Sequence, residues 1–495
     1  MADTRNHAAN PSVLKLNKFI SPSNIRDNKR KPRPPGPPAL PIIGHLHLLK
    51  QPIHRSIHKL SHTYGPIMSL RFVEECLVKK NDIVFANRPL TLAGKYLSYD
   101  YKSMAFAPYG DHWRGLRRIT NQELSSTSRL ALSSPAREDE VLILLKQLFD
   151  KCRGGGWAQV EPRHRFVDLI FDVMVRMISG KRYCGTDVAS KEAMEFKNSM
   201  DEIFELLDLS MLDLFPILQW LDPFGVVKRM KKAMMVEDNF LQSLLDENRR
   251  KGNDERKYMT LVEAMLSQKH TDPVFFSDDN IKAISGAIIA AGTETSASTM
   301  EWALANLLKH PEVMKKLKAE IESEVGTERF LDESDIGKLP YLQNVVLETL
   351  RLYPAGGLGL PRMNSEDCTV GGYHIPKGTM LMVNVWAMQR DPKLWRDASR
   401  FMPERMESGQ TGYGFIPFGA GRRICPGANI AKRLMALTMG LLVQAFEWKK
   451  IGDGEIDMME GGGLTLPKVE PLVALIRPRP EMITLLSQLS SNTDH

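Results

Sequence analysis

The segment from residue 418 to 427 has the sequence FGAGRRICPG and combines the residue types of a metal or cofactor site. Cys425 stands before Pro426, a residue well tolerated at the first helical position, and a helical pattern follows as far as Phe446. A thiol at a helix N-terminus beside arginines is expected to be held as a thiolate, the species that ligates metal. Backbone N–H groups could approach the sulfur and a flat cofactor at three glycines, namely Gly419, Gly421 and Gly427.

A long helical pattern from Asp278 to His310 has a polar centre that could move protons. Acidic residues open the pattern, and Pro311 follows its end. The centre, Ala291 to Ser296, reads AGTETS between apolar turns, where a glycine costs about 1 kcal/mol relative to alanine. Hydroxyls there can bond back to backbone carbonyls and bend the helix. A hydroxyl beside a carboxylate in such a dry region can relay protons to a bound ligand, whereas a solvent-exposed helix face suits the apolar flanks less well.

Two further pairs of residues stand one helical turn apart. Trp113 and Arg117 could both donate to one anionic group, although surface arginines at that spacing are common. Glu348 and Arg351 share one side of a helix whose other side is apolar, and alone they would form a solvated ion pair of little worth. Arg405, in the segment FMPERM, could complete an Arg–Glu–Arg network that locks this helix to a meander.

Composition and cysteine usage narrow the class of protein. The 495 residues contain 66 Lys plus Arg and 59 Asp plus Glu, and the resulting charge of +7 is spread along the chain. This charge suits an anionic protein surface or a membrane and does not require nucleic acid. The five cysteines lie far apart without a C-x-x-C pair, which argues against a disulfide scaffold or a zinc finger.

Long helical patterns dominate the chain, so the predicted fold class is mainly α (α+β). Short strand patterns occur at residues 379–388 and 472–478, each beside Gly or Pro turns. Without a visible repeat or a second linker, residues 45–495 are predicted to form one catalytic domain. Before it, residues 1–31 form a polar, basic tail without the ~20-residue apolar run of a membrane span. Residues 32–44 form a stiff proline-rich leader.

Together the four motifs resemble those of the cytochrome P-450 superfamily of haem-thiolate monooxygenases, and the resemblance extends from the leader to near residue 480. The cysteine signature F-x-x-G-x-R-x-C-x-G is matched at Phe418, Gly421, Arg423, Cys425 and Gly427. The remaining motifs are E-x-x-R at Glu348 and Arg351, A-G-x-[DE]-T-[ST] at Ala291 to Ser296, and W-x-x-x-R at Trp113 and Arg117. Four motifs in the family order make the assignment specific.

The resemblance implies the cytochrome P-450 fold, a helix-rich haem domain with small β-sheets, built around haem b (iron protoporphyrin IX). It implies that the Cys425 thiolate is the axial ligand of the iron and pushes electron density toward O–O cleavage. It also implies that Glu294 and Thr295 deliver protons and that Gly292 leaves space for dioxygen. The implied partners of the haem propionates are Trp113, Arg117, Arg362 and Arg423. Further cofactor contacts implied by the cysteine signature are Phe418 and Gly427.

Finer similarities indicate plant microsomal members that hydroxylate isoflavonoids and related phenylpropanoid or indolic metabolites. The segments that carry these similarities are SEDCTVGGYHIPKGTMLMVNVWAMQRDPKLW, FGAGRRICPG and IDMMEGGGLTLPKVEPL. One oxygen atom of dioxygen would enter a small-molecule substrate, and the second would leave as water. Substrate contacts in the family fall at segments matching residues 92–109, 206–224, 287–292, 355–360 and 464–466.

The resemblance also implies partners and a location. Electrons would come from NADPH through a flavoprotein reductase docked on a basic proximal face, at the cytosolic side of the endoplasmic reticulum. Candidate docking residues are Arg114, Arg118, Arg422, Lys432 and Arg433. Plant microsomal members begin with a hydrophobic anchor helix, whereas a polar, basic stretch stands in its place here, so membrane contact is expected to be peripheral. The basic residues that could make this contact are Lys29, Arg30, Lys31 and Arg33.

Two alternative functions stay open at this point. The family has a β-strand between the positions of Phe72 and Val73 that this sequence lacks, which would leave neighbouring strands unpaired. The gap raises the alternative of a catalytically degenerate haem-binding paralogue. A haem-thiolate isomerase or dehydratase, which needs neither dioxygen nor a reductase, is the other alternative, and the intact Glu294 and Thr295 argue against it.

Overall fold

The computed structural model describes residues 34–38, 45–64, 70–152, 156–183, 191–208, 210–251, 259–409 and 412–491. The predicted basic tail, residues 1–31, and most of the proline leader lie outside this part of the chain. The helices are α2 (Ile53–Tyr64), α3 (Leu70–Leu77), α4 (Leu92–Tyr96), α5 (Asp111–Thr120), α6 (Thr127–Leu132), α7 (Ser134–Lys151), α8 (Pro162–Ser179), α9 (Lys191–Leu206), α10 (Met211–Leu214), α11 (Val226–Lys251), α12 (Leu261–Ser267), α13 (Asp278–Lys309), α14 (Pro311–Glu324), α15 (Pro340–Leu352), α16 (Val385–Met388), α17 (Ala428–Ala445) and α18 (Ile483–Ser491). The strands are β1 (Ala158–Val160), β2 (Arg362–Met363), β3 (Cys368–Val370), β4 (Tyr373–Ile375), β5 (Met380–Leu381), β6 (Phe446–Lys450) and β7 (Ala474–Pro478). This content confirms the predicted mainly α class with small sheets, and none of the helices in the described ranges is long and apolar enough to cross a membrane.

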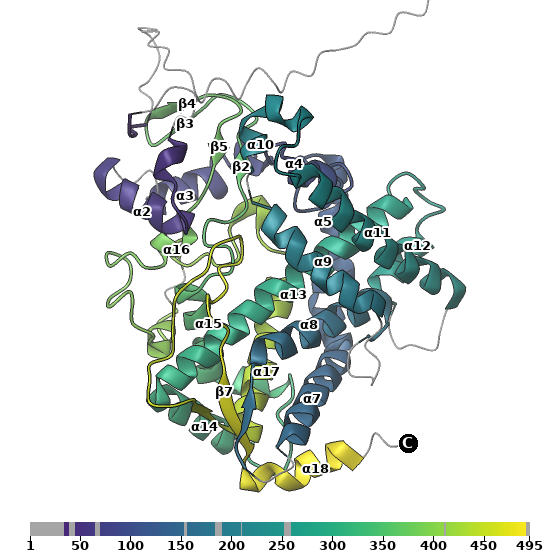
Figure 1. Ribbon diagram of the computed structural model, residues 1–495, viewed down its shortest axis with the longest axis vertical. Coiled ribbons are helices and arrows are strands. Elements are labelled where there is room, and N and C mark those ends of the chain that lie inside the picture. Colours follow the sequence, from purple (N-terminus) through teal and green to yellow (C-terminus); the bar gives the residue numbers. More distant parts are fainter. Residues whose placement is uncertain are drawn as a thin grey trace, which may run out of the picture.

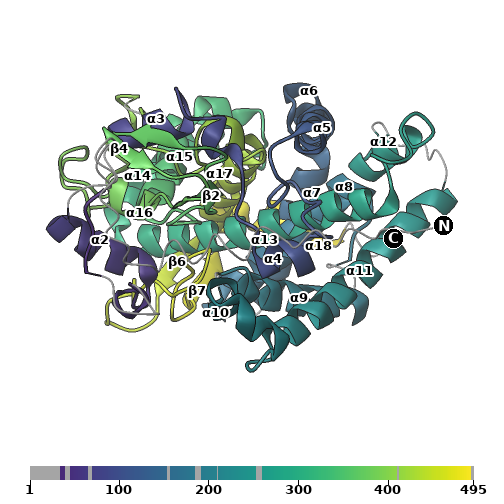
Figure 2. The ribbon, with the colours of Figure 1, turned by 90° about the horizontal axis from the view of Figure 1, so that it is seen from above.

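The longest described helix, α13, crosses the middle of the molecule, and the other large helices pack around it (Figures 1 and 2). Its bounds agree with the predicted pattern, since Asp278 and Asp279 lie in its first turn and Pro311 begins α14 directly after it. Helix α8 packs along α13 most extensively, and α11, α15 and α17 also contact it. Because neighbours cover several of its sides, α13 is apolar around most of its circumference instead of amphipathic.

The sheets are small and lie at the margins of this helical core. Strand β7 is the middle strand of a three-stranded antiparallel sheet, in which Leu475 stands opposite Gln159 of β1 and Lys449 of β6. This strand confirms the one predicted within residues 472–478. Strands β2 and β5 form one two-stranded antiparallel sheet, and β3 and β4 form another.

The strand predicted for residues 379–388 is wrong over most of its length. Only Met380–Leu381 forms a strand, and Val385–Met388 forms helix α16. The Asn384 side chain accepts a hydrogen bond from the Ala387 N–H at 2.9 Å and thereby caps this helix. An apolar run that is typical of a strand therefore packs as one helical turn.

The position of the lacking family strand is occupied by a helix. Helix α3 runs continuously through Phe72 and Val73. Cys76 and Leu77 of α3 pack with Phe85 in an apolar cluster of their own, beside the strands β3, β4 and β5. In the described residues, the chain at the junction of Phe72 and Val73 is therefore helical.

A buried ion-pair network ties α15 to the segment around Arg405. Arg351 Nε and Nη2 donate to the Glu348 carboxylate at 2.7 and 2.8 Å, and Arg405 Nε donates to Glu348 Oε1 at 2.9 Å. Arg351 Nη1 also donates to the carbonyls of Gln389 and Ala398. Glu348 and Arg351 are both 0% exposed, so the solvated pair is excluded and the predicted lock between helix and meander is confirmed.

Candidate active site

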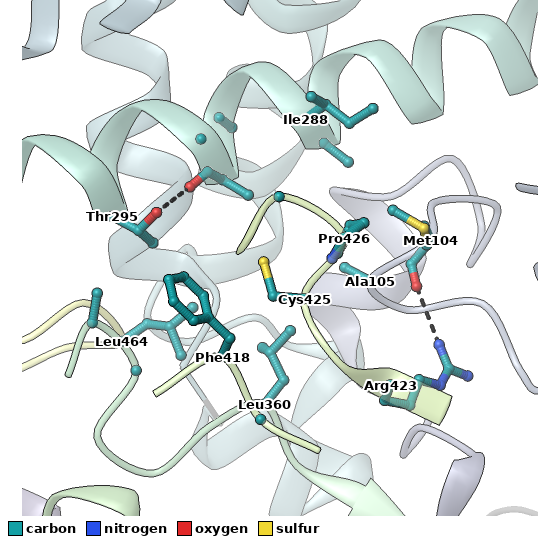
Figure 3. Close-up of a pocket in the computed structure, with 18 of the residues that line it drawn as sticks. Met104, Ala105, Ile288, Thr295, Leu360, Phe418, Arg423, Cys425, Pro426 and Leu464 are labelled. Atoms are coloured by element: carbon teal, nitrogen blue, oxygen red, sulfur yellow. Dashed lines mark hydrogen bonds between the residues drawn. The ribbon is translucent and has the colours of Figure 1, made fainter. Parts of the chain in front are cut away.

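A largely apolar cavity of about 420 Å³ lies between α13 and the loop that carries Cys425 (Figure 3). In Figure 3 the Cys425 sulfur points toward α13, the helix that carries Thr295, and the ring of Phe418 lies to one side of it. The wall is formed mainly by residues from the ranges 97–106, 283–299, 355–362, 416–435 and 464–465. Because these ranges are far apart in the sequence, only the fold brings them together.

Backbone hydrogen bonds shape the loop around Cys425. The Cys425 N–H donates to the Phe418 carbonyl at 2.9 Å, and the Gly427 N–H donates to the Cys425 sulfur. Helix α17 begins at Ala428 with Gly427 as its N-cap, so the prediction that Pro426 occupies the first helical position is wrong. The sulfur therefore lies just outside the helix, where two backbone N–H groups support the loop.

Cys425 has accessible surface because it lines the cavity, and protein atoms surround the rest of its side chain. Burial therefore raises the pKa of the thiol, and the Gly427 N–H and the charge of Arg117 offset this only in part. The thiolate at Cys425 stays a prediction, and a bound metal ion would stabilise that form. The described residues contain no group of three His, Cys, Asp or Glu side chains that could hold a metal.

Three buried guanidinium groups, of Arg88, Arg362 and Arg423, line the same cavity. Burial lowers the pKa of Arg423 to about 9 and that of Arg362 to about 10, and it also lowers the pKa of Arg88. Arg362 Nη1 is buried without a hydrogen-bond partner. A buried guanidinium group with an unpartnered N–H, such as that of Arg362, favours an anionic ligand. Arg88 is absent from the predicted site because its segment, ANRP, carries no spacing pattern that marks it.

Trp113 and Arg117 lie close to this cluster on α5. Trp113 Nε1 donates to the Met104 carbonyl at 3.2 Å, and Arg117 Nη1 donates to the Ile424 carbonyl at 2.5 Å. The Arg423 guanidinium lies over the Trp113 ring, 4.6 Å from its centroid. The structure brings the predicted residues together beside the Cys425 loop, and here their donors point to backbone carbonyls.

Four residues of the polar centre of α13, Ala291, Gly292, Thr295 and Ser296, line the cavity, and Thr293 and Glu294 are buried. Thr295 Oγ1 donates back to the Ala291 carbonyl at 2.6 Å (Figure 3). A Cβ atom at Gly292 would lie 2.8 Å from the Sδ atom of Met174 on α8. The close packing of α8 against α13 therefore gives Gly292 a structural reason beside any role in the cavity.

Glu294 is turned from the cavity toward α8 and is not among the described lining residues. Its Oε1 accepts hydrogen bonds from Arg163 Nη2 at 2.6 Å and from Thr465 Oγ1 at 3.3 Å. Arg163 also pairs with Glu301 at 3.2 Å. Burial raises the pKa of Glu294, and the Arg163 charge opposes this. Thr295 therefore lines the cavity, whereas the adjacent Glu294 contacts Arg163 of α8.

Each of the five segments expected to contact substrate contributes residues to the cavity wall. Helices α9 and α11 add lining residues that the sequence analysis missed, among them Phe204 and Glu237. Glu237 lies on the buried stripe of α11, with Met230 and Leu244. A carboxylate on an apolar helical stripe is the signal that could have identified it.

The basic residues expected at one face differ in their exposure. Arg114, Arg118 and Arg422 are exposed, whereas Lys432 and Arg433 are half-buried. The guanidinium groups of Arg114 and Arg422 both lie over the Tyr109 ring, at 5.7 and 5.5 Å from its centroid. These two residues, from α5 and the loop, therefore share one surface.

Comparisons with known proteins agree with this geometry. The model of the family described as "Cytochrome P450" matches residues 34–475. Cytochrome P450 81Q32 of Catharanthus roseus is 43% identical over 482 residues, which cover 93% of this chain and 95% of that protein. Isoflavone 3'-hydroxylase of Medicago truncatula is 43% identical and covers 92% of this chain and 94% of its own. Isoflavone 2'-hydroxylase of Glycyrrhiza echinata is 42% identical and covers 95% and 97%.

One solved structure extends the comparison to three dimensions. A zebra fish cytochrome P450, solved with progesterone, superimposes with a TM-score of 0.77 at 25% identity. The match covers 87% of this chain and 100% of that chain. The arrangement of helices around α13 is therefore one that solved proteins also adopt.

Proposed function

The chain belongs to the cytochrome P450 family of haem-thiolate monooxygenases, and we propose that it inserts one oxygen atom from dioxygen into an isoflavonoid, phenylpropanoid or indolic plant metabolite. The observation that carries this proposal is the apolar cavity whose wall contains Cys425, Thr295 and Arg362, whose buried Nη1 lacks a hydrogen-bond partner. Relatives named isoflavone hydroxylases, at 42 and 43% identity, support the aromatic substrate class.

The residues on the Cys425 side of the cavity fit a haem. Cys425 would hold the iron through its sulfur, and the Gly427 N–H that donates to this sulfur would tune the bond. The guanidiniums of Arg362 and Arg423 would neutralise the propionates, and Arg362 Nη1 has a free donor for one of them. Further groups placed at this side of the cavity are Arg88, Trp113, Arg117 and Phe418. When bound, the haem supplies the activation of dioxygen, and the protein supplies binding, orientation and protons.

We assign proton delivery in the cavity to Thr295, with Glu294 behind it. The Thr295 hydroxyl holds its proton against the Ala291 carbonyl at the cavity wall, and rotation of the side chain would turn that proton inward. Gly292 would leave the neighbouring wall open for dioxygen. Glu294 would hold a proton in reserve, which agrees with the raised pKa that burial gives it. Thr295→Ala should increase hydrogen peroxide release per NADPH consumed, while Thr295→Ser should not, and unchanged coupling in the alanine variant would contradict the assignment.

Electrons would come from NADPH through a flavoprotein reductase at the cytosolic face of the endoplasmic reticulum. The docking surface would include the exposed basic residues Arg114 and Arg118 of α5 and Arg422 of the Cys425 loop. Arg114→Glu with Arg118→Glu should slow reduction of the iron at low salt without changing substrate binding. Lys191→Glu on α9, where the lysine side chain is 91% exposed, is the matched control. Equal losses of reduction and substrate binding in the double variant would reject this surface.

The proposed reaction is tested with purified holoprotein, reductase, NADPH and isotopically labelled dioxygen on an isoflavone panel. One labelled oxygen atom should appear in the product, and Cys425→Ser should abolish turnover and the red-shifted Soret band of the reduced carbon-monoxide form. Rearrangement of a lipid hydroperoxide without NADPH would instead support an isomerase or dehydratase. A wild-type protein without the red-shifted band would support a degenerate haem binder.

A further inference from the structure

Glu237 of α11 places a carboxyl group in the cavity wall without a hydrogen-bond partner in the described part of the chain. The residue is 6% exposed, so water outside the protein does not solvate it. The adjacent Asp238, in contrast, accepts hydrogen bonds from Tyr99 at 2.8 Å and from Lys282 at 2.6 Å. The nearest cation on the facing helix therefore serves Asp238, and Glu237 is left to the cavity. Burial of a carboxyl group without partners opposes folding, which calls for a functional reason.

A glycine on α13 makes room for this carboxyl group. A Cβ atom at Gly286 would lie 2.3 Å from Glu237 Oε1 and 2.8 Å from Leu241 Cδ1. Gly286 also lines the cavity. Glycine inside a helix is unfavourable relative to alanine, and here it lets the Glu237 side chain lie flat against α13 at the cavity.

The position of Glu237 along α13 sets a length for its ligand. Gly286 and Thr295 are separated by nine residues of this helix, which corresponds to about 14 Å along its axis. A ligand that reaches from the region of Thr295 and Cys425 to Glu237 must therefore be extended, and a single small ring does not span the distance. Burial raises the pKa of Glu237 to about 7, with a contribution from Asp238, so near neutral pH the group suits an uncharged donor.

We propose that Glu237 is a specificity-determining residue that accepts a hydrogen bond from a hydroxyl or N–H group at the end of an extended aromatic substrate remote from Cys425. The inference rests on the proposed function and narrows its substrate class to flat, multi-ring molecules with a terminal uncharged donor. Relatives are named isoflavone 2'- and 3'-hydroxylases, and primed positions belong to the pendant ring of that scaffold. With the pendant ring toward Cys425, the hydroxyl of the fused ring system would meet Glu237.

The test compares two ligands that differ at this one donor, 7-hydroxyisoflavone and 7-methoxyisoflavone. Dissociation constants are measured on the haem-loaded protein from the ligand-induced shift of the Soret band, without NADPH or reductase. Wild type should bind the hydroxyl compound about tenfold more tightly, the usual size for one hydrogen bond to a buried charged group. Glu237→Leu should reduce this preference to about onefold, whereas Glu237→Gln, which keeps an acceptor oxygen and the shape, should retain part of it.

Two further variants control the comparison. Gly286→Ala should also weaken the preference, because its methyl group displaces the Glu237 carboxyl without changing any charge. Glu247→Gln, on the same helix but paired with Lys181 and not among the lining residues, should leave the tenfold ratio intact. The carbon-monoxide spectrum of each variant verifies that it is folded.

The proposal is overturned if wild type does not prefer the hydroxyl compound, or if Glu237→Leu keeps the wild-type preference. Loss of the proposed oxygenation is a separate result. If the binding preference depends on Glu237 but neither compound is hydroxylated with NADPH, the proposed function fails and the assignment of Glu237 stands. If both compounds are hydroxylated but the binding preference does not depend on Glu237, the proposed function stands and the assignment of Glu237 fails.

Discussion

Gly421 offers a sharp test of how the loop before Cys425 is held. Its φ angle is +68°, and a Cβ atom there would lie 1.6 Å from the carbonyl oxygen of Leu77 at the end of α3. Gly419, in the same loop, has a similar φ of +73°, but its nearest atom to a Cβ would be 4.0 Å away. The two positions therefore share the backbone strain of an alanine substitution and differ only in the collision.

The magnitude follows from these two contributions. An alanine in the left-handed region costs about 1–2 kcal/mol, which applies to both variants. Removing the overlap at Gly421 requires a backbone shift of the loop or of α3, which adds about 1–3 kcal/mol or more. Gly421→Ala should thus lower the unfolding free energy by roughly 2–5 kcal/mol and Gly419→Ala by about 1–2 kcal/mol.

Urea unfolding followed by circular dichroism measures both variants, and the carbon-monoxide spectrum reports the haem-thiolate content. Gly421→Ala should lose more unfolding free energy and more haem-thiolate content than Gly419→Ala, because the displaced loop carries Cys425 four residues later. Equal destabilisation of the two variants, within about 0.5 kcal/mol, would contradict this prediction, since it would mean that the contact with Leu77 has no energetic weight.

Further predictions concern the buried charges and the packing of α13. Glu348→Gln should lower the unfolding free energy in the same urea assay by about 3–5 kcal/mol, because the guanidinium groups of Arg351 and Arg405 lose their counter-charge. Glu195→Gln, in a surface ion pair 3.8 Å apart, should change the unfolding free energy by less than about 0.5 kcal/mol. Burial alone would raise the pKa of Glu460, but its hydrogen bonds and neighbouring cations lower it to about 2. The ionised form of Glu460 therefore stabilises the fold above the unfolded-state pKa. Between pH 5 and pH 3 the unfolding free energy of the wild type should fall by about 2 kcal/mol more than that of Glu460→Gln. Parallel curves of unfolding free energy against pH would contradict this prediction. Gly292→Ala should lower the unfolding free energy by about 1–3 kcal/mol, because the added methyl group meets the Met174 sulfur. In a double-mutant cycle, Met174→Ala should restore part of this loss. Additive effects of the two substitutions would show that the two side chains do not collide.

Local signals in the sequence were enough for several elements and for one network. Acidic residues at the start and Pro311 at the end define α13, because capping and the proline restriction act within a few residues. Glu348 and Arg351 stand on one helical face, and the Arg405 segment completes their network as expected. The strand predicted over 379–388 was wrong because an apolar run alone does not distinguish a strand from one capped helical turn.

The candidate site divides in the same way. Local motifs were sufficient to assign Cys425, the polar centre of α13 and the arginine-rich motifs to one haem-thiolate enzyme, since each motif is a short pattern of residue types at set spacing. Packing between distant segments was needed to show that Thr295 faces the cavity while Glu294 turns to Arg163, and that Arg88 and Glu237 join the wall. The direction in which a helical side chain points depends on the helices packed against it, and those helices come from segments far away in the chain.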